Sequence, residues 1–392
     1  MSEAYYDVII IGAGASGMMS AIQAAKRGRR IIVIDHANRA GKKILLSGGG
    51  KCNITNRHIS VADYFGLDIM FCKLALKRFP AASILQLLQE AQIATEEREH
   101  GRVFCKKGAY EIVSFLVRTA ERLGVHFLMN TKVLEVKYES NSFFIKCKDH
   151  LFEAKRLLIA SGGLACPKVG ATGFGYMIAK QFGHSIIPLK PALAGFMLPQ
   201  TSPFRNLQGI SLHVQIQIRG KYKTFEEPLL FTHQGISGPA ALQISCFWET
   251  GDTILIDFLP ADDVVLQMHQ PENGKLLVKN LLARFIPERL ARALLPEHLS
   301  DRKVAELSRK DRKIIAGCIH SYPVVPDAVE SFTKAEATSG GVSTREINPK
   351  NMESLLVKGL YFSGEVIDIT GRLGGYNIHW AFASGFVAGQ NM

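Results

Sequence analysis

The sequence predicts a mixed α/β protein in which both ends of the chain form one domain and the middle forms smaller inserted domains. Residues 6–35 read as an apolar run, a glycine-rich turn, a helix and a second apolar run, the order of a βαβ unit. Two later segments, LLIASGG at 157–163 and GLYFSGEVIDITG at 359–371, read as buried strands that run into glycine turns. Between Pro191 and about Ser339, alternating segments and then basic helical segments replace this pattern.

Length and composition indicate a soluble globular protein with two or three packed domains. The chain has 392 residues, of which 47% are hydrophobic, too many for a disordered protein. Its longest apolar runs, such as Val8–Ile11 and Ile31–Ile34, are too short to cross a bilayer, and no basic segment with a cleavage site precedes them. We therefore expect a cytoplasmic protein that has no membrane segment.

The cysteines are scattered singly along the chain. None belongs to a CxxC pair, and none has a histidine neighbour at zinc spacing. We expect neither disulfides nor a bound metal, and a reducing setting. The seven are Cys52, Cys72, Cys105, Cys147, Cys166, Cys246 and Cys318.

The charge of the chain is strongly basic and unevenly distributed. Lysine and arginine exceed the acidic residues by twelve, and between residues 21 and 60 the only acid is Asp35. Such an excess favours a polyanionic partner such as nucleic acid. The phosphates of a cofactor, together with ordinary solubility, are the alternative explanation. The basic residues of that segment are Lys26, Arg27, Arg29, Arg30, Arg39, Lys42, Lys43, Lys51 and Arg57.

The glycines of the first βαβ unit indicate a dinucleotide site. Gly12 permits a tight turn, Gly14 lets a pyrophosphate approach the helix N-terminus, and Gly17 lets helix and strand pack closely. Asp35, at the end of the second strand, would accept the adenosine ribose hydroxyls. A purely structural glycine turn is the alternative.

The end of the chain favours FAD over NAD as the resident cofactor. In GGYNIHWAFASGFVAG two glycines open an apolar helix whose small residues, among them Ala381 and Gly385, allow tight packing. The N-terminal amides of such a helix would stabilise the anionic edge of a reduced flavin. Only one dinucleotide fingerprint exists in the chain, so NADPH or NADH would bind only transiently as the reductant.

These motifs together resemble a family of bacterial FAD proteins described as NAD(FAD)-utilising dehydrogenases or aminoacetone-oxidase-like proteins. The recurring motifs are GAGASG, GKKILLSGGGKCNITN, GRVF, FTHQGISGP, SGGV and GEVIDITGRLGGYN, and they extend from residue 6 to 390. The family is related to the glutathione-reductase type of FAD fold. It includes the 23S ribosomal RNA dihydrouridine synthase and proteins described as bile-acid enone reductases.

The resemblance implies where the cofactor lies. Residues 48–53 would pass beside the pyrophosphate and the flavin, Val133 would hold the adenine through its backbone, and Glu365 would bind the ribityl chain. Cys105 departs from the family, which usually has a proline there, and we expect this to alter only a turn. The cofactor-binding residues that we expect are Gly12, Gly14, Ala15, Ser16, Gly17, Asp35, Arg39, Lys42, Lys43, Ser47, Gly48, Gly49, Gly50, Cys52, Asn53, Val133, Ser161, Gly162, Gly364, Glu365, Gly374, Gly375, Tyr376 and Asn377.

The predicted architecture is a Rossmann-type, glutathione-reductase-like FAD domain with two insertions. We expect the FAD domain at 1–192 and 340–392, an antiparallel β-barrel-like domain at 193–262, and a small basic helical domain at 263–339. Leucines at helical spacing in the last segment are more often core residues than functional ones. Its basic residues are Lys275, Lys279, Arg284, Arg289, Arg292, Arg302, Lys303, Arg309, Lys310, Arg312 and Lys313.

The expected chemistry is hydride transfer to a carbon–carbon double bond that is conjugated to a carbonyl, followed by protonation of the neighbouring carbon. Cys52 is the first candidate for the proton donor and His233, in the THQGISGP segment, is the second. Cys52 can instead simply pack under the flavin, and His233 can instead stabilise a turn. For His379, in the final helix, packing or capping is the favoured role.

Three functions follow from these observations. The first is NAD(P)H-dependent reduction of a uridine in 23S ribosomal RNA, acting on the RNA or on an assembling large subunit, and the basic insert favours it. The second is a small-molecule enone reductase or amine oxidase that uses the same site. The third is a flavin-bound protein that binds RNA or the ribosome without turnover.

Overall fold

The computed structural model describes residues 2–392, and the chain divides into two compact units. The first unit comprises the residues up to Pro191 together with Glu336–Met392, and the second is Ala192–Ala335. Each unit has its own hydrophobic core. The two ends of the chain therefore belong to one unit.

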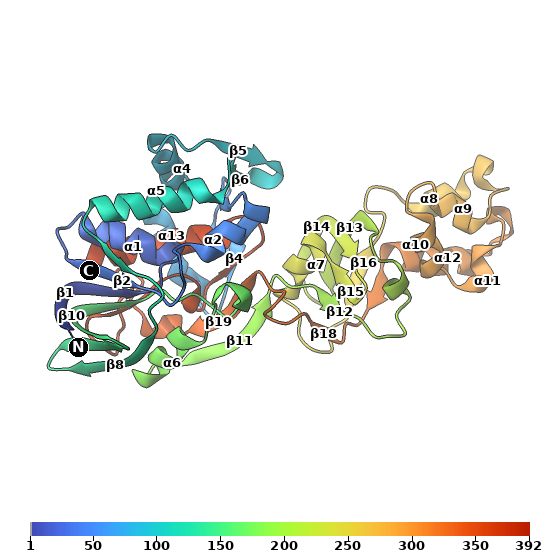
Figure 1. Ribbon diagram of the computed structural model, residues 1–392. Coiled ribbons are helices and arrows are strands. Elements are labelled where there is room, and N and C mark those ends of the chain that lie inside the picture. Colours follow the sequence, from blue (N-terminus) through green and yellow to red (C-terminus); the bar gives the residue numbers. More distant parts are fainter. Residues whose placement is uncertain (1) are drawn as a thin grey trace. The chain divides into compact units, whose positions relative to one another are not determined.

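A largely parallel sheet forms the centre of the first unit, which confirms the predicted α/β class. Its strands follow the order β7-β2-β1-β10-β9-β8, with β20 added beside β10 (Figure 1). Strands β1, β2, β7, β10 and β20 run parallel, and β8 and β9 are antiparallel. The apolar runs are buried because helices cover parallel sheets on both faces. The bounds are β1 (Ser2–Ile11), β2 (Ile31–Ile34), β7 (His126–Leu128), β8 (Val133–Glu139), β9 (Ser142–Cys147), β10 (His150–Ile159) and β20 (Leu360–Phe362).

Helix α1 (Ala15–Ala25) and helix α13 (Tyr376–Asn391) pack with their backbones in contact. A Cβ atom added to Gly385 would lie 2.4 Å from the carbonyl oxygen of Ser16, and one added to Gly389 would lie 2.5 Å from that of Ser20. The Ser20 hydroxyl donates a hydrogen bond to the carbonyl of Gly385 across this contact, at 2.9 Å. The small residues predicted to allow tight packing thus hold the first and last helices together.

Shorter elements complete the first unit. Small two- and three-stranded sheets pair β11 with β19, β21 with β4, and β6 with both β3 and β5. The helices are α2 (Lys42–Leu46), α3 (Lys73–Arg78), α4 (Ala81–Glu90), α5 (Ala109–Arg122) and α6 (Phe174–Gln181). The strands are β3 (Asn53–Asn56), β4 (Tyr64–Phe65), β5 (Thr95–Arg98), β6 (Arg102–Cys105), β11 (Ile186–Ala192), β19 (Ala337–Val342) and β21 (Thr370–Gly371).

The second unit combines an antiparallel sheet with helices. The strand order is β17-β16-β13-β14-β15-β12-β18, and the helices that follow β16 lie to one side of this sheet (Figure 1). Side chains of the sheet and of these helices share one hydrophobic core. Leu281 and Leu282 lie in this core, and Leu276 and Phe285 pack against it. The helical spacing of these apolar residues therefore reflects their packing in the core. The strands are β12 (Phe196–Met197), β13 (Ser211–Ile218), β14 (Thr224–Phe231), β15 (Gly235–Ser237), β16 (Ile254–Asp257), β17 (Tyr322–Val324) and β18 (Ala328–Val329). The helices are α7 (Gly238–Ser245), α8 (Val264–His269), α9 (Val278–Leu282), α10 (Glu288–Leu294), α11 (Glu297–Ser300) and α12 (Arg309–His320).

None of the helices formed by residues 2–392 has the length and apolar character of a membrane span. Within the same range, no cluster of three or more His, Cys, Asp and Glu side chains is arranged to hold a metal ion. All seven cysteines are free thiols.

The contact between α1 and α13 leads to a prediction about two helical glycines. Gly385→Ala should lower the free energy of unfolding by about 1–3 kcal/mol, because the new methyl group has to displace the Ser16 backbone. Gly317→Ala is the matched control, since a Cβ at this position of α12 would meet nothing within 4 Å. It should raise stability by about 0.5–1 kcal/mol through helix propensity alone. Urea unfolding measures both changes, and equal effects of the two substitutions would contradict the close contact.

Candidate functional site

Three glycines lie between the end of β1 and the first turn of α1, and of these Gly14 alone faces open space. A Cβ at Gly12 would lie 2.3 Å from the Ala160 carbonyl oxygen, and one at Gly17 would lie 1.9 Å from that of Gly12. At Gly14 an added Cβ would meet nothing within 4 Å. Gly14 is also the N-cap of α1, and no side chain caps this helix. The first amides of α1, beginning with those of Ala15 and Ser16, are therefore available to an anionic group.

Asp35 is held rigidly where β2 ends. Its Oδ2 accepts a hydrogen bond from the Ala13 N–H at 2.7 Å, and its Oδ1 accepts one from the Ala37 N–H at 2.8 Å. Each carboxylate oxygen can accept a further hydrogen bond. The carboxylate therefore fixes the glycine turn and keeps acceptor capacity for hydroxyl groups such as those of a ribose.

Glu365 joins three segments of the first unit beside this turn. Its Oε2 lies 2.5 Å from the Lys43 ammonium, and its Oε1 accepts a hydrogen bond from the Thr338 N–H at 2.8 Å. The Thr338 hydroxyl in turn accepts hydrogen bonds from the N–H groups of Leu164 and Ala165. The predicted residues Lys43, Glu365 and the strand-end turn at 161–165 are thus parts of one network.

Ser161 supplies an unused polar group next to this network. Its hydroxyl oxygen is buried and has no hydrogen-bond partner among residues 2–392. The next residue, Gly162, has a φ of +76° and open space where a Cβ would be. A buried hydroxyl without a partner is costly unless a ligand group satisfies it. Together with the uncapped α1 and the carboxylates of Asp35 and Glu365, Ser161 fits the polar groups of FAD.

The glycine-rich segment 47–50 forms a short 3-10 turn whose backbone is exposed. Gly48, Gly49 and Gly50 have φ values of +57°, +65° and +87°, which explains the three consecutive glycines. Ser47 accepts a hydrogen bond from the Cys52 N–H through its carbonyl, at 2.9 Å, and so closes the turn. The Lys51 ammonium lies 3.8 Å from Glu96. The turn therefore presents backbone, and not side chains, to a ligand.

Cys52 lies behind this turn and is fully buried. Burial, the largest effect, raises the pKa of its thiol to about 12, although a hydrogen bond with Ser47 lowers it and the nearby Cys105 raises it further. The thiol therefore keeps its proton at neutral pH, and Lys51 does not produce the lowered pKa that its position in the sequence suggests. Cys105 is buried at the end of strand β6, and a bend at 106–107 follows it directly.

His379 attaches the glycine-rich segment to the final helix. Its Nε2–H donates to the Phe79 carbonyl at 3.0 Å, so its Nδ1 accepts a hydrogen bond from the Thr55 hydroxyl of β3 at 2.9 Å. The side chain has no exposed surface, and it packs as the sequence suggests. Burial, the largest effect, lowers the pKa of His379 to about 4, although the bond to Phe79 raises it.

The start of α13 is packed against the same strand. An added Cβ at Gly375 would lie 2.5 Å from the Thr55 carbonyl oxygen, so the helix N-terminus touches β3 directly. Tyr376 is buried in an edge-to-face contact with Tyr64. The Asn377 amide donates to and accepts from the Gly371 backbone, at 2.8 Å each. Tyr376 is thus packed inside the protein and the Asn377 amide is bonded to the Gly371 backbone, so their expected contact with the cofactor stays a prediction.

A basic cavity of about 340 Å³ accounts for two more of the expected residues. Arg39 and Lys42 line it together with Lys168, which the sequence analysis did not include. None of the three takes part in an ion pair within residues 2–392. The cavity is therefore suited to an anion. Its other lining residues are Asn38, Leu46 and Val169.

The remaining expected residues lie in different surroundings. Val133 begins β8 and is buried at the edge of the central sheet. His233 is exposed in the turn between β14 and β15 of the second unit, whereas the other expected residues belong to the first unit.

Two residues near the Glu365 network, Thr338 and Glu336, were not predicted from the sequence. Burial, the largest effect, raises the pKa of the Glu336 carboxyl, although the charges of Lys43 and Arg102 lower it. The signal for Thr338 was its place two residues before the glycines of the SGGV motif.

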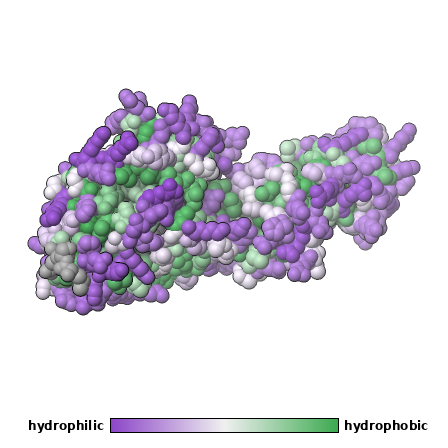
Figure 2. All heavy atoms as spheres, in the orientation of Figure 1, coloured by the Kyte–Doolittle hydropathy of each residue, from purple (hydrophilic) through white to green (hydrophobic). Residues whose placement is uncertain are grey.

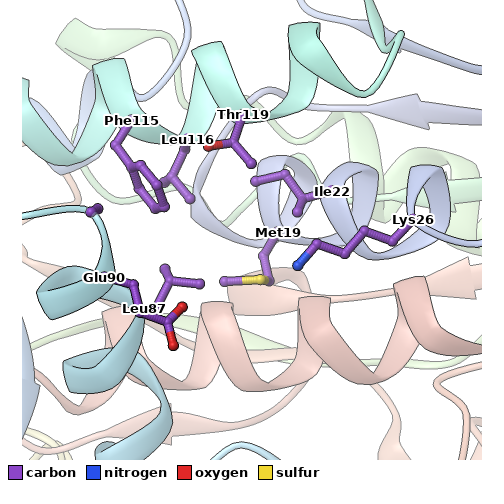
Figure 3. A pocket seen from close by; sticks show the side chains of 9 residues that line it. Met19, Ile22, Lys26, Leu87, Glu90, Phe115, Leu116 and Thr119 are labelled. Atoms are coloured by element: carbon purple, nitrogen blue, oxygen red, sulfur yellow. The ribbon is translucent and has the colours of Figure 1, made fainter.

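A second cavity, of about 170 Å³, lies between α1, α4 and α5 and contains none of the expected residues (Figure 3). Met19, Ile22 and Leu116 form its apolar wall, and Lys26 and Glu90 lie at its rim. The basic cavity, the glycine turn and the Glu365 network therefore remain the candidate site.

The buried His379 leads to a prediction about pH. Its native pKa of about 4 is below the ordinary value of 6.5, so as the pH falls the unfolded state binds the proton first. The protein should lose about 3 kcal/mol of stability between pH 6.5 and pH 4, and lose none from this group above pH 7. Urea unfolding at several pH values measures the loss. His379→Gln is the control, because it should show a correspondingly smaller change, and an identical pH dependence would contradict the assignment.

Relatives of known name match almost the whole chain. The chain is 40% identical over 391 residues to a protein named ribosomal RNA dihydrouridine synthase from Haemophilus influenzae, covering 97% of each chain. The protein of the same name from Escherichia coli is 38% identical, covering 99% of this chain and 98% of the relative. A 3-dehydro-bile acid delta(4,6)-reductase from Clostridium scindens is 29% identical, covering 97% of each chain.

Solved structures show the same fold at low identity. A quinol fumarate reductase from E. coli superposes with a TM-score of 0.54 at 17% identity, covering 100% of this chain and 70% of that chain. A quinol-fumarate reductase with menaquinol molecules gives a TM-score of 0.52, also at 17% identity, covering 99% of this chain and 71% of the other. The model of the HI0933-like protein Rossmann domain matches residues 6–391. The chain therefore belongs to the HI0933-like family of FAD-binding Rossmann proteins, and it is an FAD-dependent oxidoreductase.

Proposed function

We propose that this protein reduces the C5=C6 double bond of a uridine in 23S ribosomal RNA to dihydrouridine, with NADPH or NADH as the reductant. The observation that carries the proposal is the 38–40% identity, over nearly the full length, to two proteins named ribosomal RNA dihydrouridine synthase. The uridine double bond is conjugated to C4=O, so it accepts hydride at C6 and a proton at C5. The proposal includes a cytoplasmic location, where ribosomal RNA is found.

The residues that would hold the cofactor lie in the first unit. The α1 N-terminus at Gly14 would face the pyrophosphate, Asp35 the ribose, and Ser161 with Glu365 the ribityl hydroxyls. The chemistry that bound FAD supplies is hydride transfer. The exposed backbone of Gly48–Gly50 would lie against the cofactor, and the charges of Arg39 and Lys42 would offset those of its phosphates.

Proton donation to C5 is the step that this chain's own side chains have to perform. We assign it to Cys52, with His233 as the second candidate. The raised pKa keeps the Cys52 thiol protonated at neutral pH, as a donor requires. Because the sulfur has no exposed surface, the role requires the preceding Gly48–Gly50 turn to move when substrate binds.

A second candidate function is reduction of a small-molecule enone. The 29% identity to the bile-acid reductase over the same length favours it, since that reaction also reduces a conjugated double bond. The net charge of +12 favours the RNA substrate, because a neutral or anionic small molecule does not need so many cations. Binding to ribosomal RNA without turnover is the third possibility, and the product assay separates it from the first.

The proposed reaction predicts a definite product. Unmodified 23S ribosomal RNA incubated anaerobically with the FAD-loaded protein and NADPH or NADH should gain dihydrouridine. Nucleoside mass spectrometry detects it as a uridine that carries two extra hydrogens. The same incubation without a nicotinamide is the control. If neither the RNA nor an assembling large subunit gives product while a steroid enone does, the small-molecule function replaces this proposal.

The assignment of the proton donor predicts the behaviour of two neighbouring cysteines. Cys52→Ala should abolish product formation while FAD absorbance and its reduction by the nicotinamide persist. Cys105→Ala is the matched control, since this thiol is also buried beside the same segment, and it should retain activity. Unchanged turnover by Cys52→Ala would remove Cys52 from the mechanism, and loss of turnover in His233→Gln would then assign the role to His233.

A further inference from the structure

The eleven basic residues of the helical segment 275–313 divide into those whose side chains bond to the rest of the second unit and those whose side chains do not. Arg292 pairs with Glu288, Arg302 with Asp311, and Lys279 with Asp301. Three more donate hydrogen bonds inside the unit: Arg284 to the Asn273 side chain, Arg289 to the Asn206 carbonyl, and Arg312 to the carbonyls of Met268 and Val304. Six of the eleven basic residues are thus explained by the packing of the helices.

Three of the other five residues come together on α12. Arg309, Lys310 and Lys313 are exposed, and within the described part of the chain none of their side chains makes an ion pair or a hydrogen bond. They are one, three and four residues apart, so they share a face of the helix. We call these three residues the α12 basic patch. The last two of the five, Lys275 and Lys303, are exposed in other segments.

The α12 basic patch points away from the core of the second unit. Ile315 and Ile319 bury the opposite face of the helix. With 3.6 residues per turn, Lys310 and Lys313 lie about 120–180° around the helix axis from these two isoleucines, and Arg309 lies about 80–120° from them. Hydrophilic residues predominate over the helices of this unit on the face that Figure 2 shows. The fold therefore presents the three cations to solvent.

Acidic residues nearby do not neutralise the patch. Asp311 lies between the cations in sequence, but its Oδ2 accepts hydrogen bonds from the Ser308 N–H at 2.9 Å, the Ser308 hydroxyl at 2.7 Å and Arg302 at 3.0 Å. Three cations in the first two turns of a helix also oppose the helix dipole. The arrangement therefore does not serve the stability of α12, and an external anion is the partner that its charge fits.

Gly317 provides a separate observation on the same face. It lies one turn beyond Lys313, it is exposed, and an added Cβ would meet nothing within 4 Å. Glycine is less favourable than alanine inside a helix, and the protein's own packing does not require it here. The missing side chain leaves the face beside the cations flat, so that the backbone of a partner can approach closely.

We propose that the α12 basic patch, Arg309, Lys310 and Lys313, binds the phosphate backbone of the ribosomal RNA substrate. The inference rests on the proposed function for the identity of the RNA. The spacing of the cations along one helix face suits successive phosphates of a nucleic acid strand, and contacts of this kind position the substrate without reading its bases. The patch belongs to the second unit, and the residues that would hold FAD belong to the first.

Removing the patch should weaken RNA binding in a salt-dependent manner. The test variant is Arg309→Gln, Lys310→Gln and Lys313→Gln in the full-length, FAD-loaded protein. Binding of unmodified 23S ribosomal RNA is measured by filter retention between about 50 and 300 mM salt. Because each lost phosphate contact lowers the slope of log K against log salt by about 0.7–0.9, the variant's slope should be smaller by about 2–3.

A matched control removes three cations that already have acidic partners. Lys137, Lys221 and Arg292 lie 3.5, 2.7 and 2.7 Å from the carboxylates of Glu135, Asp252 and Glu288. Replacing each by glutamine changes the net charge by the same three units and should leave the salt slope close to that of the unaltered protein. In both variants, reduction of FAD by the nicotinamide should proceed at the normal rate.

The outcomes distinguish a failure of the α12 basic patch as an RNA site from a failure of the proposed reaction. Equal salt slopes in the test and control variants would overturn the patch as an RNA site, even if the unaltered protein forms dihydrouridine. A reduced slope in the test variant alone supports the patch. If the unaltered protein binds the RNA in a salt-sensitive manner but forms no dihydrouridine, the proposed reaction fails and the patch stands. Binding only to ribosomal proteins would overturn the patch as an RNA site.

Discussion

The backbone contact between the first and last long helices is the constraint on which the rest of the first unit depends. Gly385 and Gly389 of α13 leave no room for a Cβ against Ser16 and Ser20 of α1. This contact brings together segments that are more than 360 residues apart in the sequence. The Ser384 hydroxyl accepts a hydrogen bond from the Gly364 N–H at 2.9 Å, which places Glu365 beside the α1 N-terminus. The polar groups proposed for FAD are close together because these helices are.

The glycine-rich turn depends on the same helix. His379 bonds to Thr55 and Phe79, and Gly375 packs on the Thr55 backbone, so α13 positions β3 and the Gly48–Gly50 turn in front of it. A neutral, buried histidine suits this role because both of its ring nitrogens have partners. The turn itself carries positive φ values at three successive residues and lacks side chains. Strand β3, which is held by α13, thus follows closely in the sequence after the Gly48–Gly50 turn, which has no side chains.

The second unit shows why charge in a sequence is an incomplete guide to binding. Arg312 and Lys313 are neighbours, yet Arg312 donates to two carbonyls inside the unit while Lys313 is exposed without a partner. Asp311 holds the helix start through Ser308 and does not serve as a counter-ion for Lys310. The excess of positive charge in this unit is therefore partly structural, and three of the remaining cations lie together on α12.

Local spacing of apolar and small residues was enough to predict the α/β class, the βαβ unit at residues 6–35 and the tight packing of the final helix. The motifs also predicted Asp35, Lys43, Ser161 and Glu365 as neighbours of one cofactor. The internal contacts of Tyr376 and Asn377 and the full burial of Cys52, with its raised pKa, became visible only in the folded structure. The same is true of the places of Thr338 and Lys168 in the candidate site. Burial and hydrogen-bond partners come from residues far apart in the chain, and spacing along the sequence carries no information about them.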